Sequence, residues 1–240
     1  MAGLFRNLGR MAGPHVRKAK WLLRSLTGTQ AEVIQAEFEV GRDMAGAIAR
    51  SGQLDADPRW QRILAQTGGR LVNRLAKRER RFSFSALADP QPNAFALPGG
   101  FVYVTRPLLE ICATKDDELA FVLAHEMAHV VRGHVMDRVL SSTLLNVASR
   151  ASLAARMMNK AVLEAALKLL QNAYSQEQET EADRFAVRLL LSAEMNPLAG
   201  AAVLGKLSSA GDGSDELPSY FSTHPPSSAR MDRIHQWLNK

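Results

Sequence analysis

Two histidines four residues apart, with a glutamate beside the first, are the residues whose types and spacing most directly indicate chemistry. They are His125, Glu126 and His129 in the segment HEMAH. Residues four apart on an α-helix are turned only about 40° from each other, so both imidazoles leave one face and can share a zinc ion. Glu126 stands where it could take a proton from a zinc-bound water. The pattern predicts a hydrolytic metal site, which still needs a third protein ligand.

The nearest candidate for that ligand is unfavourably placed. His134 follows His129 by five residues, which is about 140° around a continuous helix. The three-histidine metzincin spacing is also absent, because Arg132 and Val135 stand where that signature has glycine and histidine. We therefore expect His134 to be a polar residue near the helix end or a hydrogen-bond partner of a ligand.

Two carboxylates later in the chain offer an alternative ligand. Glu179 and Asp183 share one face of a further predicted helix, and Ala182 is small enough to let two helices approach. Glu179 could complete the zinc shell while Asp183 accepts the free ring N–H of a liganding histidine. The competing interpretation is a solvated acidic helix start, since Glu177 and Glu181 stand nearby. Combined with HEMAH, the ligand interpretation is the better one.

The elements that must position these residues are mostly helical, and the fold class predicted is α+β, predominantly helical. Helices are predicted over residues 31–52, 58–80, 114–140, 141–174, 175–193, 198–209 and 227–238. Thr114 is expected to cap the helix that carries HEMAH. Strands are predicted only at residues 82–87, 94–97 and 101–105, the last two around the turn signal Pro98-Gly99-Gly100.

Charge divides the chain into an appendage at residues 1–31 and a domain at residues 32–240. The chain has 30 Lys plus Arg against 24 Asp plus Glu, and residues 1–31 hold six basic residues and no acidic one. The domain is therefore neutral, which argues against a nucleic-acid partner and predicts no selection of acidic substrates. The single cysteine excludes an internal disulfide and a cysteine-based zinc cluster.

The appendage is basic and amphipathic, with Phe5 and Trp21 among its apolar residues. Such a segment suits peripheral contact with an anionic membrane, and a targeting presequence or a disordered tail are the alternatives. The sequence has neither a secretory signal nor a stretch of 18 uncharged apolar residues. We expect a cytoplasmic location, peripheral to a membrane, with organelle targeting as the alternative.

Four blocks of sequence resemble, in the same order, the motifs of a known family over nearly all of residues 32–238. The blocks are Asn93-AFALPGG-FVYVT, HEMAH, Glu179-TEA-Asp183 and Thr223-His224-Pro225-Pro226-SSA-Arg230. The family is the gluzincin-type zinc metallopeptidases that include the heat-shock protease HtpX, the CAAX prenyl endopeptidases and the mitochondrial OMA-type proteases. A minor departure is Arg106-Pro107, where a Thr-Gly pair is common.

The resemblance implies a zincin-like metalloprotease domain with a small β-sheet over the active-site helix. It implies one Zn²⁺ per chain bound by His125, His129 and Glu179. Glu126 would be the catalytic base, and Asp183 would contact a zinc ligand without binding the ion. His224 and Arg230 match the late block and are the catalytic candidates for stabilising the tetrahedral oxyanion. Two alternatives stay open. Arg230 only holds the loop predicted at residues 223–226, called the His224 loop, or His224 closes the site at rest as a fourth zinc ligand.

Substrate binding is expected at the β part, where an edge strand can pair with an extended polypeptide. Ala94–Leu97 or Phe101–Thr105 could supply that edge, with Asn93, Ala94, Phe95 and Ala96 as binding residues. The plain alternative is an ordinary hairpin packed over the helix.

The function predicted is a metalloendopeptidase acting on unfolded or membrane-associated proteins in proteolytic quality control. The alternatives are a non-catalytic, zinc-stabilised, chaperone-like module and a membrane-tethering protein; the oligomeric state stays open.

Overall fold

The computed structural model describes residues 29–76, 79–112, 115–139, 173–211, 219–225 and 228–239. Nearly all of the predicted appendage at 1–31, and with it the predicted membrane contact, lies outside these residues. Most of the predicted helix at 141–174 does so as well. None of the described helices is long and apolar enough to cross a bilayer.

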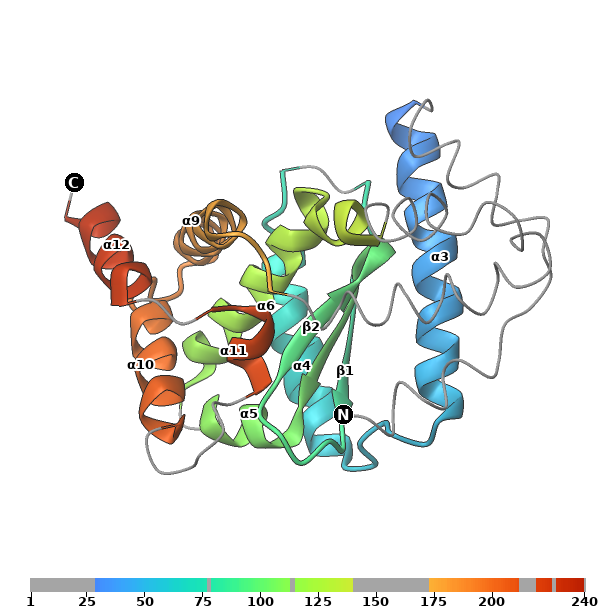
Figure 1. Ribbon diagram of the computed structural model, residues 1–240, viewed down its shortest axis with the longest axis horizontal. Helices are drawn as coiled ribbons and strands as arrows, with labels where there is room; N and C mark the ends of the chain where they lie inside the picture. Colours follow the sequence, from blue (N-terminus) through green and yellow to red (C-terminus); the bar gives the residue numbers. More distant parts are fainter. Residues whose placement is uncertain are drawn as a thin grey trace, which may run out of the picture.

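Helices surround a small sheet, which confirms the predominantly helical α+β fold (Figure 1). The helices are α3 (Gln30–Arg50), α4 (Pro58–Val72), α5 (Arg106–Cys112), α6 (Asp116–Val131), α9 (Gln176–Ser192), α10 (Ala199–Gly211), α11 (Ser219–Thr223) and α12 (Ser228–Leu238). The strands are β1 (Ser83–Leu87), β2 (Ala94–Leu97) and β3 (Phe101–Thr105), and the 3₁₀ turn η1 (Pro98–Gly100) joins β2 to β3. Further helical residues at 134–139 follow α6.

The sheet has the order β1-β3-β2, with β3 parallel to β1 and antiparallel to β2. Helices α4 and α6 pack against the sheet, and α3 stands on its other side, against η1 (Figure 1). Because β3 is the central strand, Phe101–Thr105 cannot be the edge that binds a polypeptide, so that alternative is wrong. Ala94–Leu97 forms β2, which has no second neighbouring strand among the described residues.

Two predicted helix ends need correction, and two helices are additional to the predicted set. α4 ends at Val72 rather than near residue 80, because the residues that follow are largely exposed and the chain must turn back towards β1. α6 ends at Val131 rather than near residue 140, because Gly133 adopts a left-handed φ of 80°. The additional helices are α5 and α11. Thr114 lies outside the described residues, and the N-cap of α6 is Lys115.

Helix α3 approaches η1 so closely that both contacting positions require glycine. A Cβ atom at Gly41 would lie 1.7 Å from the Pro98 carbonyl oxygen. Gly99 has a φ of 76°, and a Cβ there would lie 2.5 Å from the Phe38 Cα. Two of the glycines in the chain therefore fix the distance between α3 and the turn that starts β3.

We expect Gly41→Ala to lower the free energy of unfolding by about 1–3 kcal/mol or more, because the new methyl group must displace the backbone of η1. Gly69→Ala is the matched control, since Gly69 lies in α4 and a Cβ there meets no atom within 4 Å. Chemical denaturation of both variants measures the difference. A Gly41→Ala protein as stable as the Gly69→Ala protein would contradict this packing.

Candidate metal centre

Helix α6 carries HEMAH through the interior of the molecule. All its residues from Glu118 to Val130 are buried, in keeping with a sequence that is apolar on every side. Helix α9 packs extensively against α6 and begins with a capping box between Ser175 and Gln178. The inner face of α9 presents Glu179 and Asp183, both buried, towards α6. The packing of the two helices therefore brings the histidines of α6 close to the carboxylates of α9.

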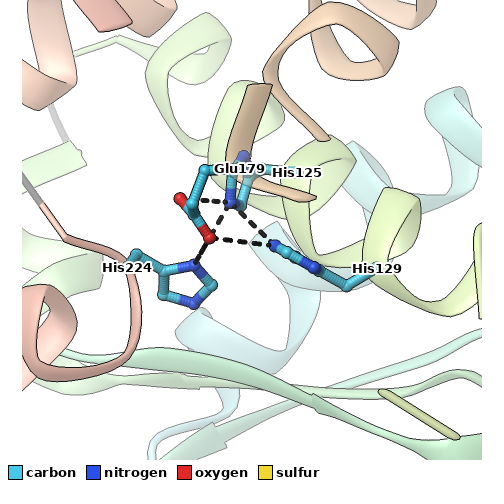
Figure 2. A group of neighbouring side chains, drawn as sticks. All are labelled: His125, His129, Glu179 and His224. Carbon is cyan, nitrogen blue, oxygen red and sulfur yellow. Dashed lines mark hydrogen bonds and ion pairs between the residues drawn. The ribbon is translucent and has the colours of Figure 1, made fainter. Parts of the chain in front are cut away.

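Four side chains converge between α6, α9 and the residue after α11 (Figure 2). The Nε2 atoms of His125 and His129 lie 3.1 Å apart. The Glu179 carboxylate reaches both rings, with Oε2 at 3.5 Å from His125 Nε2 and Oε1 at 3.4 Å from His129 Nε2. His224 Nδ1 is 2.9 Å from Glu179 Oε1 and 3.2 Å from His125 Nε2. The structure therefore brings together the three predicted zinc ligands and His224.

This arrangement fits a divalent metal ion. Nitrogen and oxygen ligands at about 2.0–2.1 Å from a tetrahedral ion lie about 3.3 Å from one another, close to the separations above. The three histidines and Glu179 are at most 3% exposed. Imidazole and carboxylate donors of this kind, buried and converging, suit zinc and other first-row metals. These residues can hold a metal ion without rearrangement of the helices that carry them.

Behind the cluster, His125 is supported by a buried ion pair. Its Nδ1 lies 3.0 Å from Asp183 Oδ1, the contact predicted for Asp183. Arg230 donates from Nε and Nη2 to both Asp183 oxygens, at 2.8 and 2.7 Å. Burial would raise the pKa of Asp183, but the Arg230 guanidinium and His125 together hold that pKa below its usual range. Burial would likewise lower the pKa of His125, yet Glu179 and Asp183 raise it to about 9.

Arg230 is placed differently from the catalytic role expected of it. Besides Asp183 it contacts Glu179, with Nη1 2.7 Å from Oε2, and it is 2% exposed. Its Nη1 also lies 3.5 Å from the Pro225 carbonyl oxygen. The guanidinium thus contacts both buried carboxylates of α9 and the carbonyl group next to His224, and its role stays a prediction.

His129 is supported by a different chain of contacts. Its Nδ1 lies 3.1 Å from His134 Nδ1, and His134 Nε2 lies 3.3 Å from Glu181 Oε2. Arg132 Nε is 3.1 Å from the other Glu181 oxygen. Because α6 breaks at Gly133, His134 returns to the side of His129 that faces away from Glu179. It contacts a predicted ligand, as expected, and is not among the four converging residues.

Glu126 is fully buried on the opposite side of His224 from Glu179. Its Oε1 lies 3.2 Å from His224 Nε2. Its Oε2 has no hydrogen-bond partner among the described residues. Burial would raise the pKa of Glu126, but His224, His129 and His125 together lower it. A charged carboxylate buried beside the converging ligands can act as a proton acceptor there.

The predicted substrate-binding residues lie on or next to β2, which packs against α6. Ala94 and Ala96 are buried, and Phe95 is half-buried and stacks on Tyr103 with ring centroids 5.3 Å apart. The buried Asn93 donates its backbone N–H to Thr105 Oγ1 at 2.8 Å. One residue earlier, the Pro92 carbonyl accepts the Tyr220 N–H at 3.1 Å, which ties the start of β2 to α11.

Sequence reasoning missed two tyrosines that pack on the metal-site histidines. Tyr174 stacks on His129 with centroids 3.7 Å apart, and Tyr220 stacks on His224 at 4.6 Å. Both are buried, and burial raises the pKa of each phenol. No spacing rule singles them out. Their only signal is scarcity, since the chain has three tyrosines.

Comparison with known proteins gives the family. The profile of Peptidase family M48 matches residues 58–238, which include all four converging side chains. The chain belongs to this family. It is 28% identical over 76% of its length to "Mitochondrial metalloendopeptidase OMA1" of Schizosaccharomyces pombe, and 27% identical over 82% to "Beta-barrel assembly-enhancing protease" of Escherichia coli. It is also 31% identical over 61% to "Metalloprotease LoiP" of Escherichia coli.

The M48 chain spans only part of these curated relatives. The alignments cover 60%, 43% and 59% of the three proteins, respectively. Family membership confirms the resemblance drawn from the four sequence blocks and agrees with a metal-dependent site. The roles of individual residues stay predictions, and they rest on the contacts described above.

We expect His134→Ala to weaken Zn²⁺ binding by about 10- to 100-fold, because His129 loses the partner of its outer ring nitrogen. His235→Ala is the matched control, since that histidine is exposed in α12. Competition of each protein against a chromogenic chelator measures the affinity. Equal affinities for the two variants would show that His134 does not support the metal site.

Proposed function

We propose that this M48 chain is a zinc-dependent metalloendopeptidase that hydrolyses peptide bonds of unfolded or membrane-associated polypeptides. The main support for this proposal is that the fully buried Glu126 lies beside the converging donors of His125, His129 and Glu179. The M48 family and the metalloprotease names of the relatives support the reaction class.

Zinc is the proposed metal because the donors are imidazole nitrogens and a carboxylate oxygen, with no thiolate. When bound, zinc lowers the pKa of a water molecule and polarises a peptide carbonyl. Glu126 accepts the proton of the attacking water and passes it to the nitrogen of the leaving amine. Asp183 and Arg230 hold His125 and Glu179 in place, through the contacts at 2.7–3.0 Å described above.

His224 is proposed to close the site at rest. Its ring stands between Glu179 and Glu126, with one nitrogen towards each carboxylate, and it is 1% exposed. A substrate carbonyl needs the space that this ring fills, since Glu126 and the proposed ligands are also buried. The residues after α11 must therefore move for substrate to enter. This proposal takes up the alternative of a fourth ligand rather than that of an oxyanion donor.

The outer edge of β2, which pairs with no second strand among the described residues, is the proposed place for the substrate backbone. β2 is an edge strand packed on α6, so a chain added to it would run along the helix that carries Glu126. Pairing of this kind uses main-chain hydrogen bonds and requires an extended polypeptide, which folded proteins seldom present. The link between Pro92 and Tyr220 connects this edge to the His224 loop.

We expect Glu126→Gln to lower kcat on unfolded casein by at least about 100-fold while Zn²⁺ remains bound, because the amide keeps the shape but cannot accept the proton. Hydrolysis and bound zinc are measured on the same sample. A chelator should abolish wild-type hydrolysis, and added Zn²⁺ should restore it. Undiminished hydrolysis by Glu126→Gln would remove the proposed base.

We expect His224→Ala to raise kcat/KM for a short unstructured peptide, because the ring that fills the entry to the site is gone. Tyr220→Phe serves as a comparison, since it keeps the aromatic stack on His224. Steady-state kinetics of both variants with Zn²⁺ present measure the change. A fall in kcat for His224→Ala with unchanged zinc content would instead assign His224 to the oxyanion.

A further inference from the structure

A cavity of about 900 Å³ lies on the face of α9 that points away from the metal centre. It is bounded by the ends of α4 and α6 and by α12. Its charged lining consists of five arginines and two glutamates: Arg74, Arg132, Arg184, Arg188, Arg233, Glu177 and Glu181. We call this cavity the arginine groove. The zero net charge of residues 32–240 conceals this local concentration of positive charge.

Two of these arginines have a guanidinium that no carboxylate among the described residues neutralises. Arg184 and Arg188 are exposed, stand four residues apart on one face of α9, and form no ion pair within the described part of the chain. The others are partly engaged. Arg132 pairs with Glu181, and Arg233 donates to the Thr180 hydroxyl at 2.8 Å.

The groove also offers apolar surface between its charges. Leu75, Phe185 and Leu189 line it together with the arginines, and the Arg132 guanidinium lies 5.8 Å from the Phe185 ring centroid. Guanidinium groups bind carboxylates through paired N–H donors, and apolar walls accept side-chain methylene groups. The lining favours an acidic stretch of polypeptide over a membrane.

We propose that the arginine groove binds an acidic segment of a polypeptide substrate, outside the cleavage site. The assignment to a substrate rests on the proposed protease function, whereas the binding itself does not. Glu179 and Asp183 face inwards from α9, and Arg184 and Arg188 face outwards, so the helix separates recognition from cleavage. The domain at residues 32–240, although its net charge is zero, thereby selects acidic substrates. This differs from the expectation drawn from net charge alone.

Binding is tested with fluorescein-labelled deca-glutamate and deca-glutamine peptides and Zn²⁺-loaded Glu126→Gln protein, which keeps the chains intact. The test variant is Arg184→Glu with Arg188→Glu. The charge-matched control is Arg42→Glu with Arg62→Glu, two exposed arginines of α3 and α4 outside the groove. Fluorescence anisotropy gives the affinities, and thermal denaturation confirms that both double variants fold.

Deca-glutamate is expected to bind more tightly than deca-glutamine, and more weakly as salt rises from about 50 to about 200 mM. The Arg184/Arg188 variant should lose about tenfold or more in affinity, and the Arg42/Arg62 control less than about twofold. Equal losses in both variants, or no preference for deca-glutamate, would overturn the inference. It would also be overturned if the test variant lost binding to phosphatidylglycerol vesicles but kept binding to deca-glutamate.

A cleavage assay separates this inference from the proposed function. With active enzyme, a peptide with a glutamate tail should have a lower KM than the same peptide with a glutamine tail, and the Arg184/Arg188 variant should abolish the difference. If nothing is cleaved but deca-glutamate binding behaves as expected, the protease proposal fails and the groove stands. If cleavage occurs with identical KM values for both tails, the groove is not a substrate site.

Discussion

The burial of charge between α6 and α9 is the constraint on which the structure depends. Glu126, Glu179 and Asp183 are nearly inaccessible to water, and an unpaired buried charge costs several kcal/mol. One guanidinium, that of Arg230, contacts two of these carboxylates. The imidazoles of His125, His129 and His224 contact the Glu179 carboxylate, and His224 also lies against Glu126 Oε1. A divalent cation among them would supply the positive charge that this cluster of acids needs.

The same constraint explains why the surrounding elements are held so firmly. α6 is buried on all sides, so its histidines have little freedom once α9 packs against it. Tyr174 and Tyr220 cover two of the imidazoles with their rings, and α11 is tied to the start of β2 through Pro92. The edge strand, the His224 loop and the metal cluster therefore form one connected unit.

How much the sequence predicts depends on whether a residue acts within one helix. The pairing of His125 with His129, and of Glu179 with Asp183, follows from helical periodicity, and the structure brings all four together. The contacts of Arg230 could not be predicted, because they depend on how α12 packs against α9. His134 contacts His129, as expected of a ligand's partner, but the exact contact could not be predicted because Gly133 ends α6 between the two histidines. The central place of β3 likewise depends on pairing between distant segments, which alternation in one strand does not specify.

Net charge sums over a surface on which charges are unevenly distributed, so it does not describe the arginine groove. The proposed zinc site, by contrast, consists of a few atoms of His125, His129 and Glu179. A crystal structure of the Zn²⁺-loaded protein, with anomalous scattering recorded at the zinc edge, tests it most directly. We predict a single peak among His125 Nε2, His129 Nε2 and the Glu179 carboxylate. A peak elsewhere, or zinc bound without Glu179, would contradict it.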